Sequence, residues 1–196
     1  MEDNHFRAPR STVGDGLIIR TYRDEDARAL CEATVSSFEH LSPFMPWANS
    51  TQTVEQTRSI IEGFESGFVE STDFVLGIWR QVDDAFIGGT GFHLREGPLD
   101  YGSAEIGMWI AAEYAGQGLG KRALGVLLRW GFTTWPWQRL AWRCNAENIA
   151  SIRCAKANGF FQEGLLRGQY NPIDGSRRDT ACFSILRHEW ADRRAV

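Results

Sequence analysis

The sequence predicts a single α/β (α+β) domain built on a mixed sheet, and three observations support this prediction. A chain of 196 residues is long enough to bury a sizeable core and short enough to be one domain. Helical and strand-like segments follow one another as two helices, a group of closely spaced strands, and then strands that alternate with two more helices. No repeat, linker or low-complexity tract divides the chain.

The individual elements follow from hydrophobic periodicity and from turn residues. Acidic residues favour a helix start at 23–41, where the helix dipole stabilises them. Pro43 and Pro46 exclude a helix in the next segment. The three runs after the second helix are so closely spaced that an antiparallel meander is the simplest connection. Helices are expected at 23–41, 53–68, 118–132 and 147–158, and strands at 16–22, 72–81, 83–96, 103–110, 138–145, 161–170 and 178–190.

Residues 1–15 are polar and predicted to form a flexible N-terminus, so that residues 16–196 form the domain. The net charge of −4 gives no reason to expect nucleic-acid binding. The four cysteines show no C-x-x-C and no histidine at zinc spacing, which favours free thiols and no metal. No secretory signal and no membrane span is recognised, so a cytoplasmic location is expected.

The stretch EYAGQGLGKRAL places Gly116, Gly118 and Gly120 directly before Lys121 and Arg122. A glycine turn that leads into a helix start exposes backbone N–H groups and the positive end of the helix dipole, which is a typical anion site. Two cations at this dipole-unfavourable end of a helix are explained if an anion neutralises them. The alternative is a plain tight turn with two solvated cations.

Two nucleotide-binding motifs fit this stretch poorly. A P-loop, G-x-x-x-x-G-K-[ST], would need glycine at Ala115 and a hydroxyl residue at Arg122. Gly118, Gly120 and Ala123 formally satisfy the dinucleotide fingerprint. That match, however, follows a meander late in the chain, which disfavours a dinucleotide fold. Coenzyme A is the third candidate ligand.

Three segments together resemble the GNAT superfamily of acetyl-coenzyme A-dependent N-acetyltransferases. AGQGLG is similar to the family's [RQ]-x-x-G-x-[GA] turn, although Ala115 replaces the first residue. Residues 145–167 are similar to its N-x-x-S…N-G-F…E-G segment. HLSPFMPWA (40–48) is similar to the Leu-Pro-Trp loop of the branch that acetylates the N-terminal alanine or serine of ribosomal proteins. The resemblance covers roughly residues 16–190.

The resemblance implies a mixed, mostly antiparallel, splayed sheet of about 6–7 strands flanked by about four helices. Strands near 104–111 and 138–145 would part to admit acetyl-CoA, and members of this branch are often homodimers. Backbone N–H groups of the turn would bind the pyrophosphate, main-chain groups of one strand would pair with the pantetheine arm, and two side chains of the next helix would face its sulfur. The residues at these positions are Gln117, Gly118, Leu119, Gly120, Lys121 and Arg122; Met108, Trp109 and Ile110; and Asn148 and Ser151. Asn148 is equally consistent with an ordinary helix N-cap.

Proton transfer is predicted from the same resemblance. The tyrosine that protonates the departing thiolate in many members is Ala155 here, so Ser151 is the expected acid. Glu105, at a strand start, is the first candidate for the base, with a solvent-facing glutamate as the alternative. His93 is the second candidate, and a structural histidine is the alternative there.

Two segments are expected on the acceptor side. The first contains Phe44, Met45 and Trp47 between prolines, and its alternative is a lid packed on the core. The second contains Tyr170 before a turn and the pair Arg177-Arg178 after it, for which a solvated strand end is the alternative. Loops on a rigid scaffold commonly carry specificity.

The predicted function is acetyl transfer from acetyl-CoA to an amine by direct attack in a ternary complex, with a protein N-terminus as the first candidate acceptor. A small-molecule amine such as an aminoglycoside or polyamine is the alternative substrate. Ala115 and Ala155 leave open a CoA-binding protein without catalysis, and a nicotinamide-dependent enzyme is the remotest alternative. The sequence does not identify the acceptor.

Overall fold

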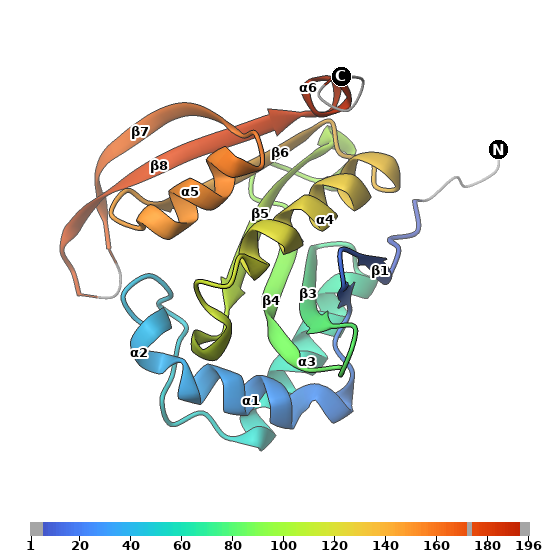
Figure 1. Cartoon of the computed structure of the whole chain (residues 1–196), viewed down its shortest axis with the longest axis vertical. Coiled ribbons are helices and arrows are strands. Elements are labelled where there is room, and N and C mark those ends of the chain that lie inside the picture. The colour runs from blue at the N-terminus through green and yellow to red at the C-terminus, as the bar shows by residue number, and fades with distance from the viewer. Residues whose placement is uncertain (1–5, 172–173, 193–196) are drawn as a thin grey trace.

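The computed structural model describes residues 6–171 and 174–192 (Figure 1). Within these residues the chain forms eight strands in one sheet, in the order β1-β2-β3-β4-β5-β6-β8-β7, and six α-helices. The strands are β1 (Ser11–Gly14), β2 (Leu17–Arg20), β3 (Asp73–Arg80), β4 (Phe86–His93), β5 (Ser103–Ile110), β6 (Arg139–Asn145), β7 (Phe161–Tyr170) and β8 (Arg177–Leu186). The helices are α1 (Ala27–Ser36), α2 (Phe38–Leu41), α3 (Val54–Val69), α4 (Leu119–Thr133), α5 (Ile149–Ala157) and α6 (Arg187–Asp192).

All strand pairs are antiparallel except β5 with β6, which are parallel. A mixed, mostly antiparallel sheet was the prediction, and it is confirmed. Within the described residues, no helix is long and apolar enough to cross a bilayer.

The sheet has an apolar core on each face. Alternate side chains of β2 and β3 point to opposite faces: Leu17 and Leu76 pack with α4, while Trp79 packs with α1 and α3. The larger cluster includes Trp135 and Trp137, whose rings stack at 5.6 Å. Figure 1 shows α4 and α5 on the near side of β5 and β6.

The predicted first helix is interrupted at Ser37. Its backbone leaves the helical region there, and the hydroxyl accepts a hydrogen bond of 2.9 Å from the N–H of Ala112, just after β5. Ser37 is 1% exposed, so the hydroxyl needs this partner. The long helix therefore divides into α1 and α2, and the junction is fixed to the segment that leads into the glycine turn.

Two other predicted boundaries are wrong. Residues 11–14, expected within a flexible N-terminus, form β1 and pair with β2. The last strand ends at Leu186 rather than continuing to residue 190, because α6 begins at Arg187. The Arg187 guanidinium donates hydrogen bonds to the carbonyls of Phe132, Trp135 and Trp137, which holds this end of the sheet to the end of α4.

Candidate functional site

The first feature of the site is a gap in strand pairing between β5 and β6. Their parallel register covers three residues of each strand and ends at Glu105 and Ala141. Beyond this point β5 pairs only with β4 as far as Ile110, and β6 pairs only with β8 as far as Asn145. The facing edges therefore present backbone N–H and C=O groups that need other partners. Three residues predicted to bind the cofactor lie on the edge of β5: Met108, Trp109 and Ile110.

The glycine turn lies between β5 and α4, at the open end of this gap. Gly116 and Gly118 have φ values of 74° and 75°, and Gly118 is the N-cap of α4. A Cβ built on either glycine meets no atom within 4 Å, so the backbone conformation requires glycine here and steric crowding does not. The first intrahelical bond runs from the N–H of Arg122 to Gly118, so the N–H groups before Arg122 are available to an anion. Predicted positions Gln117, Leu119 and Gly120 belong to the same turn.

The two cations after the turn have different environments. The Arg122 guanidinium donates from Nε and Nη2 to the carbonyl of Asp15, which ties the start of α4 to the turn between β1 and β2. Lys121 is exposed, and its side chain makes no ion pair with a described residue. The structure therefore gives Arg122 a structural partner that the sequence did not predict.

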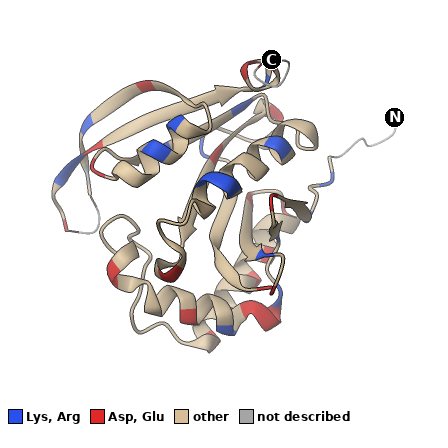
Figure 2. Cartoon of the chain, in the orientation of Figure 1, with Lys and Arg blue, Asp and Glu red and all other residues tan. Residues whose placement is uncertain are grey.

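Helices α4 and α5 form a basic face in a chain whose net charge is negative (Figure 2). Their sequences contain no acidic residue, whereas α1 and α2 contain Glu32 and Glu39. The basic residues of the two helices are Lys121, Arg122, Arg129, Arg153 and Lys156. The positive potential favours a polyanionic ligand at the start of α4.

Ser151 stands beside the unpaired part of β6. Asn148 is the N-cap of α5, and its side-chain oxygen accepts a hydrogen bond of 3.0 Å from the N–H of Ser151. The Ser151 hydroxyl in turn accepts 2.9 Å from the indole N–H of Trp142. Burial raises the pKa of the neighbouring Cys144 thiol, and hydrogen bonds from Ser151 and Trp142 oppose that increase. The Ser151 hydroxyl can thus donate its hydrogen to a sulfur atom.

Asp73, His93 and Glu105 form a row across three neighbouring strands. His93 is paired with Asp73 on β3 and with Glu105 on β5. The imidazole Nδ1 lies 2.7 Å from an Asp73 carboxylate oxygen. Because directly opposed residues of antiparallel strands share a face of the sheet, the three side chains lie on one face at the point where β5 and β6 separate.

Glu105 is buried, so the alternative of a solvent-facing glutamate is wrong. Its side chain is 7% exposed and forms ion pairs of 3.4 Å with Arg95 and 3.5 Å with Arg143. One carboxylate oxygen, Oε2, is buried without a hydrogen-bond partner among the described residues. Sequence reasoning missed Arg95 and Arg143, because neither belongs to a motif.

The two predicted acceptor segments contact each other and the sheet. The ring of Trp47 lies 5.6 Å from that of Trp109 on β5, and Phe44 and Trp47 are 36% and 47% exposed. The Arg178 guanidinium donates 2.7 Å to the carbonyl of Pro43. For Arg178 the alternative of a solvated strand end is therefore wrong. Tyr170 ends β7, but its side chain lies outside the described residues.

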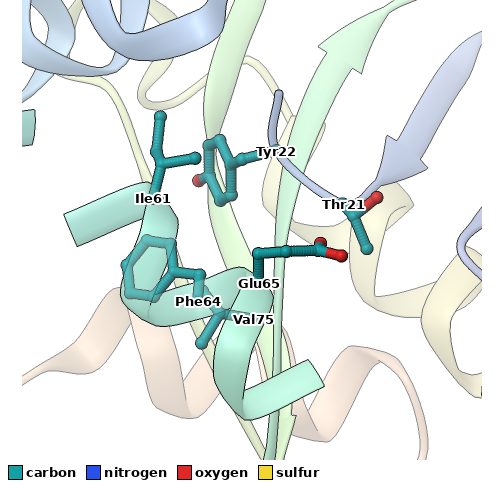
Figure 3. A pocket seen from close by; sticks show the side chains of 6 residues that line it. All are labelled: Thr21, Tyr22, Ile61, Phe64, Glu65 and Val75. Carbon is teal, nitrogen blue, oxygen red and sulfur yellow. The ribbon is translucent and has the colours of Figure 1, made fainter. Parts of the chain in front are cut away.

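A separate small hollow lies between α3 and strands β2 and β3 (Figure 3). Its lining contains none of the predicted site residues: it consists of Thr21, Tyr22, Ile61, Phe64, Glu65 and Val75. Burial raises the pKa of the Tyr22 phenol. The hollow is a packing feature beneath α3, away from the separated strands.

Comparison with known proteins connects this geometry to a family. Residues 16–161 match the family model described as "Acetyltransferase (GNAT) domain". The uncharacterized N-acetyltransferase p20 of Bacillus licheniformis is 29% identical over 179 residues, which cover 89% of this chain and 95% of that protein. The uncharacterized N-acetyltransferase YoaA of Bacillus subtilis is 30% identical over 88% of this chain and 94% of its own length.

The fold is also similar to solved structures. One of them is RimL, a ribosomal L7/L12 alpha-N-protein acetyltransferase in complex with coenzyme A. It superposes with a TM-score of 0.80 at 22% identity, covering 89% of this chain and 96% of that one. At this identity the likeness shows the fold.

Proposed function

The chain belongs to the GNAT acetyltransferase family, and we propose that it transfers the acetyl group of acetyl-CoA to the α-amino group of a protein or peptide. N-acetyltransferase activity and the use of acetyl-CoA are the family's properties. The acceptor class is the proposal. It is supported by the neighbour named as an alpha-N-protein acetyltransferase and by the acceptor side of the site.

One observation carries the donor half of the proposal: the facing edges of β5 and β6 are unpaired beyond Glu105 and Ala141. An extended amide-containing arm adds to such an edge as a strand does. The glycine turn offers N–H groups to a pyrophosphate at one end of the gap, and Lys121 lies beside it. The residues present therefore fit coenzyme A, with the reactive thioester placed toward Glu105.

Ser151 is proposed to assist the departing thiolate. A thiol such as cysteine has a pKa of about 8.5, so a thiolate leaves tolerably well near neutral pH and a hydrogen bond is sufficient help. The Ser151 hydroxyl accepts from Trp142, and its own hydrogen, which bonds Cys144 in the free protein, would turn to the sulfur of the bound cofactor. Ala155, at the position of the family's usual tyrosine, is fully buried in the core.

The acceptor side fits an α-amino group. An α-amine with a pKa near 8 is free for roughly a tenth of the time at pH 7, whereas a lysine near 10.4 is free for less than about a thousandth. Exposed Phe44 and Trp47 offer an apolar rim to the first residues of a peptide. Arg178 connects this rim to the β7–β8 hairpin.

The proposal is tested by thiol release from acetyl-CoA with a panel of amines. The panel contains peptides that begin with Ala or Ser, and N-terminally blocked versions of these peptides that contain an internal lysine. It also contains a polyamine and an aminoglycoside. We expect turnover only with free N-termini, located by mass spectrometry. Turnover confined to the polyamine or the aminoglycoside would support the small-molecule alternative, and tight CoA binding without any turnover would support a non-catalytic protein.

Ser151→Ala tests the proposed acid. Turnover should fall while the Kd for acetyl-CoA changes little, because the hydroxyl acts on the leaving sulfur. Ser66→Ala is the matched control, since Ser66 lies on α3 and its hydroxyl donates to the helix carbonyl of Glu62. Unchanged turnover in Ser151→Ala would remove Ser151 from this role.

A further inference from the structure

His93 and Asp73 form a hydrogen-bonded pair at the end of β4 and the start of β3. The Nδ1 atom of His93 lies 2.7 Å from Oδ1 of Asp73, and the histidine side chain is 19% exposed. A carboxylate accepts a hydrogen bond, so it selects the tautomer with hydrogen on Nδ1 and leaves a lone pair on Nε2. No hydrogen bond joins Nε2 to a described residue.

Two glycines determine where the imidazole lies. A Cβ built on Gly107 of β5 would stand 2.7 Å from Nε2 of His93, and one on Gly91 of β4 would stand 3.1 Å from its Cε1. The first of these distances is shorter than side chains permit, so the ring lies directly on the backbone of the two strands. From its position opposite Glu105, His93 therefore extends along the sheet toward Gly107. That residue directly precedes the predicted pantetheine-binding stretch that begins at Met108.

We propose that His93 is the general base of the reaction and that Asp73 is its positioning residue. This inference rests on the proposed function, because it needs an amine beside the thioester. The incoming group is mostly an ammonium at pH 7. Nε2 takes one proton from it, and the free amine then attacks the thioester carbon. As the C–S bond breaks, the attacking nitrogen loses its second proton, and this proton passes to the departing thiolate with help from the Ser151 hydroxyl. His93 then returns the first proton to water, so that an amide and a thiol are formed and the base is regenerated.

The charges around His93 support this role over a structural one. Asp73 faces it from β3 and Glu105 from β5, while Arg95 and Arg143 are paired with Glu105. Because Arg95 and Arg143 offset the charge of Glu105, Asp73 is the carboxylate beside the ring that is left to attract an ammonium group.

Glu105 is the less suitable proton acceptor of the two candidates. Its carboxylate is 7% exposed, compared with 19% for His93, and both of its ion pairs are with guanidinium groups that are more exposed than itself. In this assignment Glu105 is the ion-pair partner of Arg95 and Arg143, and His93 accepts the proton.

Steady-state kinetics test the base. His93→Gln should lower kcat about 100-fold or more with the acetyl-CoA Kd unchanged, and Asp73→Asn should lower it less. In both variants the ascending limb of the kcat/KM–pH profile should shift, because imidazole is the side chain that titrates in the neutral range. His188→Gln, on exposed α6, and Asp100→Asn, in an exposed turn, are the matched controls and should retain the wild-type profile.

Chemical rescue separates catalysis from folding. Added imidazole should restore part of the turnover of His93→Gly and leave the wild type unaffected. A His93→Gln enzyme with wild-type kcat and pH profile would overturn the proposal, as would loss of the ascending limb in Glu105→Gln but not in His93→Gln.

A nitrogen-15 NMR spectrum of the free protein tests the pair without any substrate. In the neutral imidazole of His93, the tautomer with hydrogen on Nδ1 should dominate, and this preference should be lost in Asp73→Asn. Absence of this tautomer would overturn the proposed role of Asp73. If the tautomer is present but no N-terminal peptide is acetylated, the proposed function fails while the pair itself stands.

Discussion

Arg178 provides the sharpest test of the acceptor side, because one side chain connects its two segments. Its guanidinium donates 2.7 Å to the carbonyl of Pro43 and 3.0 Å to the carboxylate of Asp174. Pro43 begins the segment that carries Trp47, whose ring contacts the sheet through Trp109. Removal of the guanidinium in Arg178→Ala should free this segment while leaving the acetyl-CoA side unchanged.

The magnitude follows from the bonds that are lost. A hydrogen bond with one charged partner contributes about 1.5–3 kcal/mol, and the 25% exposure of the Arg178 side chain places it in the lower part of that range. A loss of about 1.5–2 kcal/mol corresponds to an increase of about 10–30-fold in the KM for the peptide. Arg178→Lys should fall between Arg178→Ala and the wild type, because an ammonium group lacks the fork that reaches both partners.

The assay is steady-state kinetics with an N-terminal peptide, together with acetyl-CoA titration. Arg177→Ala is the matched control, since the neighbouring guanidinium bonds Gly168 within the same hairpin. A peptide KM within twofold of wild type in Arg178→Ala would refute the reasoning. So would a parallel weakening of acetyl-CoA binding, because it would show a general loss of structure.

Three further predictions concern the turn, the cap and pH. Gly118→Ala forces a residue with a side chain into a left-handed conformation at a cost of about 1–2 kcal/mol, so calorimetry should show weaker acetyl-CoA binding. Gly164→Ala is the control, because a Cβ is also unobstructed there and φ is not positive. This control should bind acetyl-CoA as the wild type does. Asn148→Ala removes the N-cap of α5 and should cost about 1 kcal/mol of unfolding free energy in urea titrations. The Arg139 guanidinium lowers the pKa of Glu163. The pair therefore stabilises the fold above the usual glutamate pKa of about 4.3, and this contribution is lost as the pH falls through the pKa of the folded state. In unfolding titrations, Glu163→Gln should be less stable than wild type at pH 7, by a difference that shrinks at acid pH.

Sequence patterns predicted the features that are determined by residues close together in the chain. The family resemblance and the mixed sheet are confirmed, and α4 buries Leu124, Leu127 and Leu128 while exposing Lys121 and Arg122, as its periodicity requires. The glycine turn was recognisable because three glycines stand directly before Lys121 and Arg122 at a predicted helix start.

Contacts between distant residues were not predictable in the same way. Ser37 interrupts a sequence with good helical periodicity, and its hydroxyl accepts a hydrogen bond from the N–H of Ala112, 75 positions away. Arg178 and Pro43 are 135 positions apart, and only the fold brings them together. Residue roles within the site, a homodimer and a cytoplasmic location stay predictions.

The proposed reaction centre lies where the pairing between β5 and β6 ends. β5 stays paired with β4 up to Ile110 and β6 stays paired with β8 up to Asn145, while the pairing between β5 and β6 ends at Glu105 and Ala141. The separation of β5 and β6 leaves two strand edges with unpaired N–H and C=O groups. An apolar side chain would not form hydrogen bonds with these groups, whereas an amide-containing arm does.

Strand pairing also positions the side chains of the proposed proton transfer at the point where β5 and β6 separate. Glu105 is the last residue of β5 that pairs with β6, and the β4–β5 register places His93 directly opposite it, with Asp73 one strand further. A one-residue slip of β4 against β5 would move His93 to the other face of the sheet. The β5–β6 pairing thus sets where the donor enters, the β4–β5 register sets where the proposed proton acceptor lies, and Gly91 and Gly107 leave the space that the imidazole occupies.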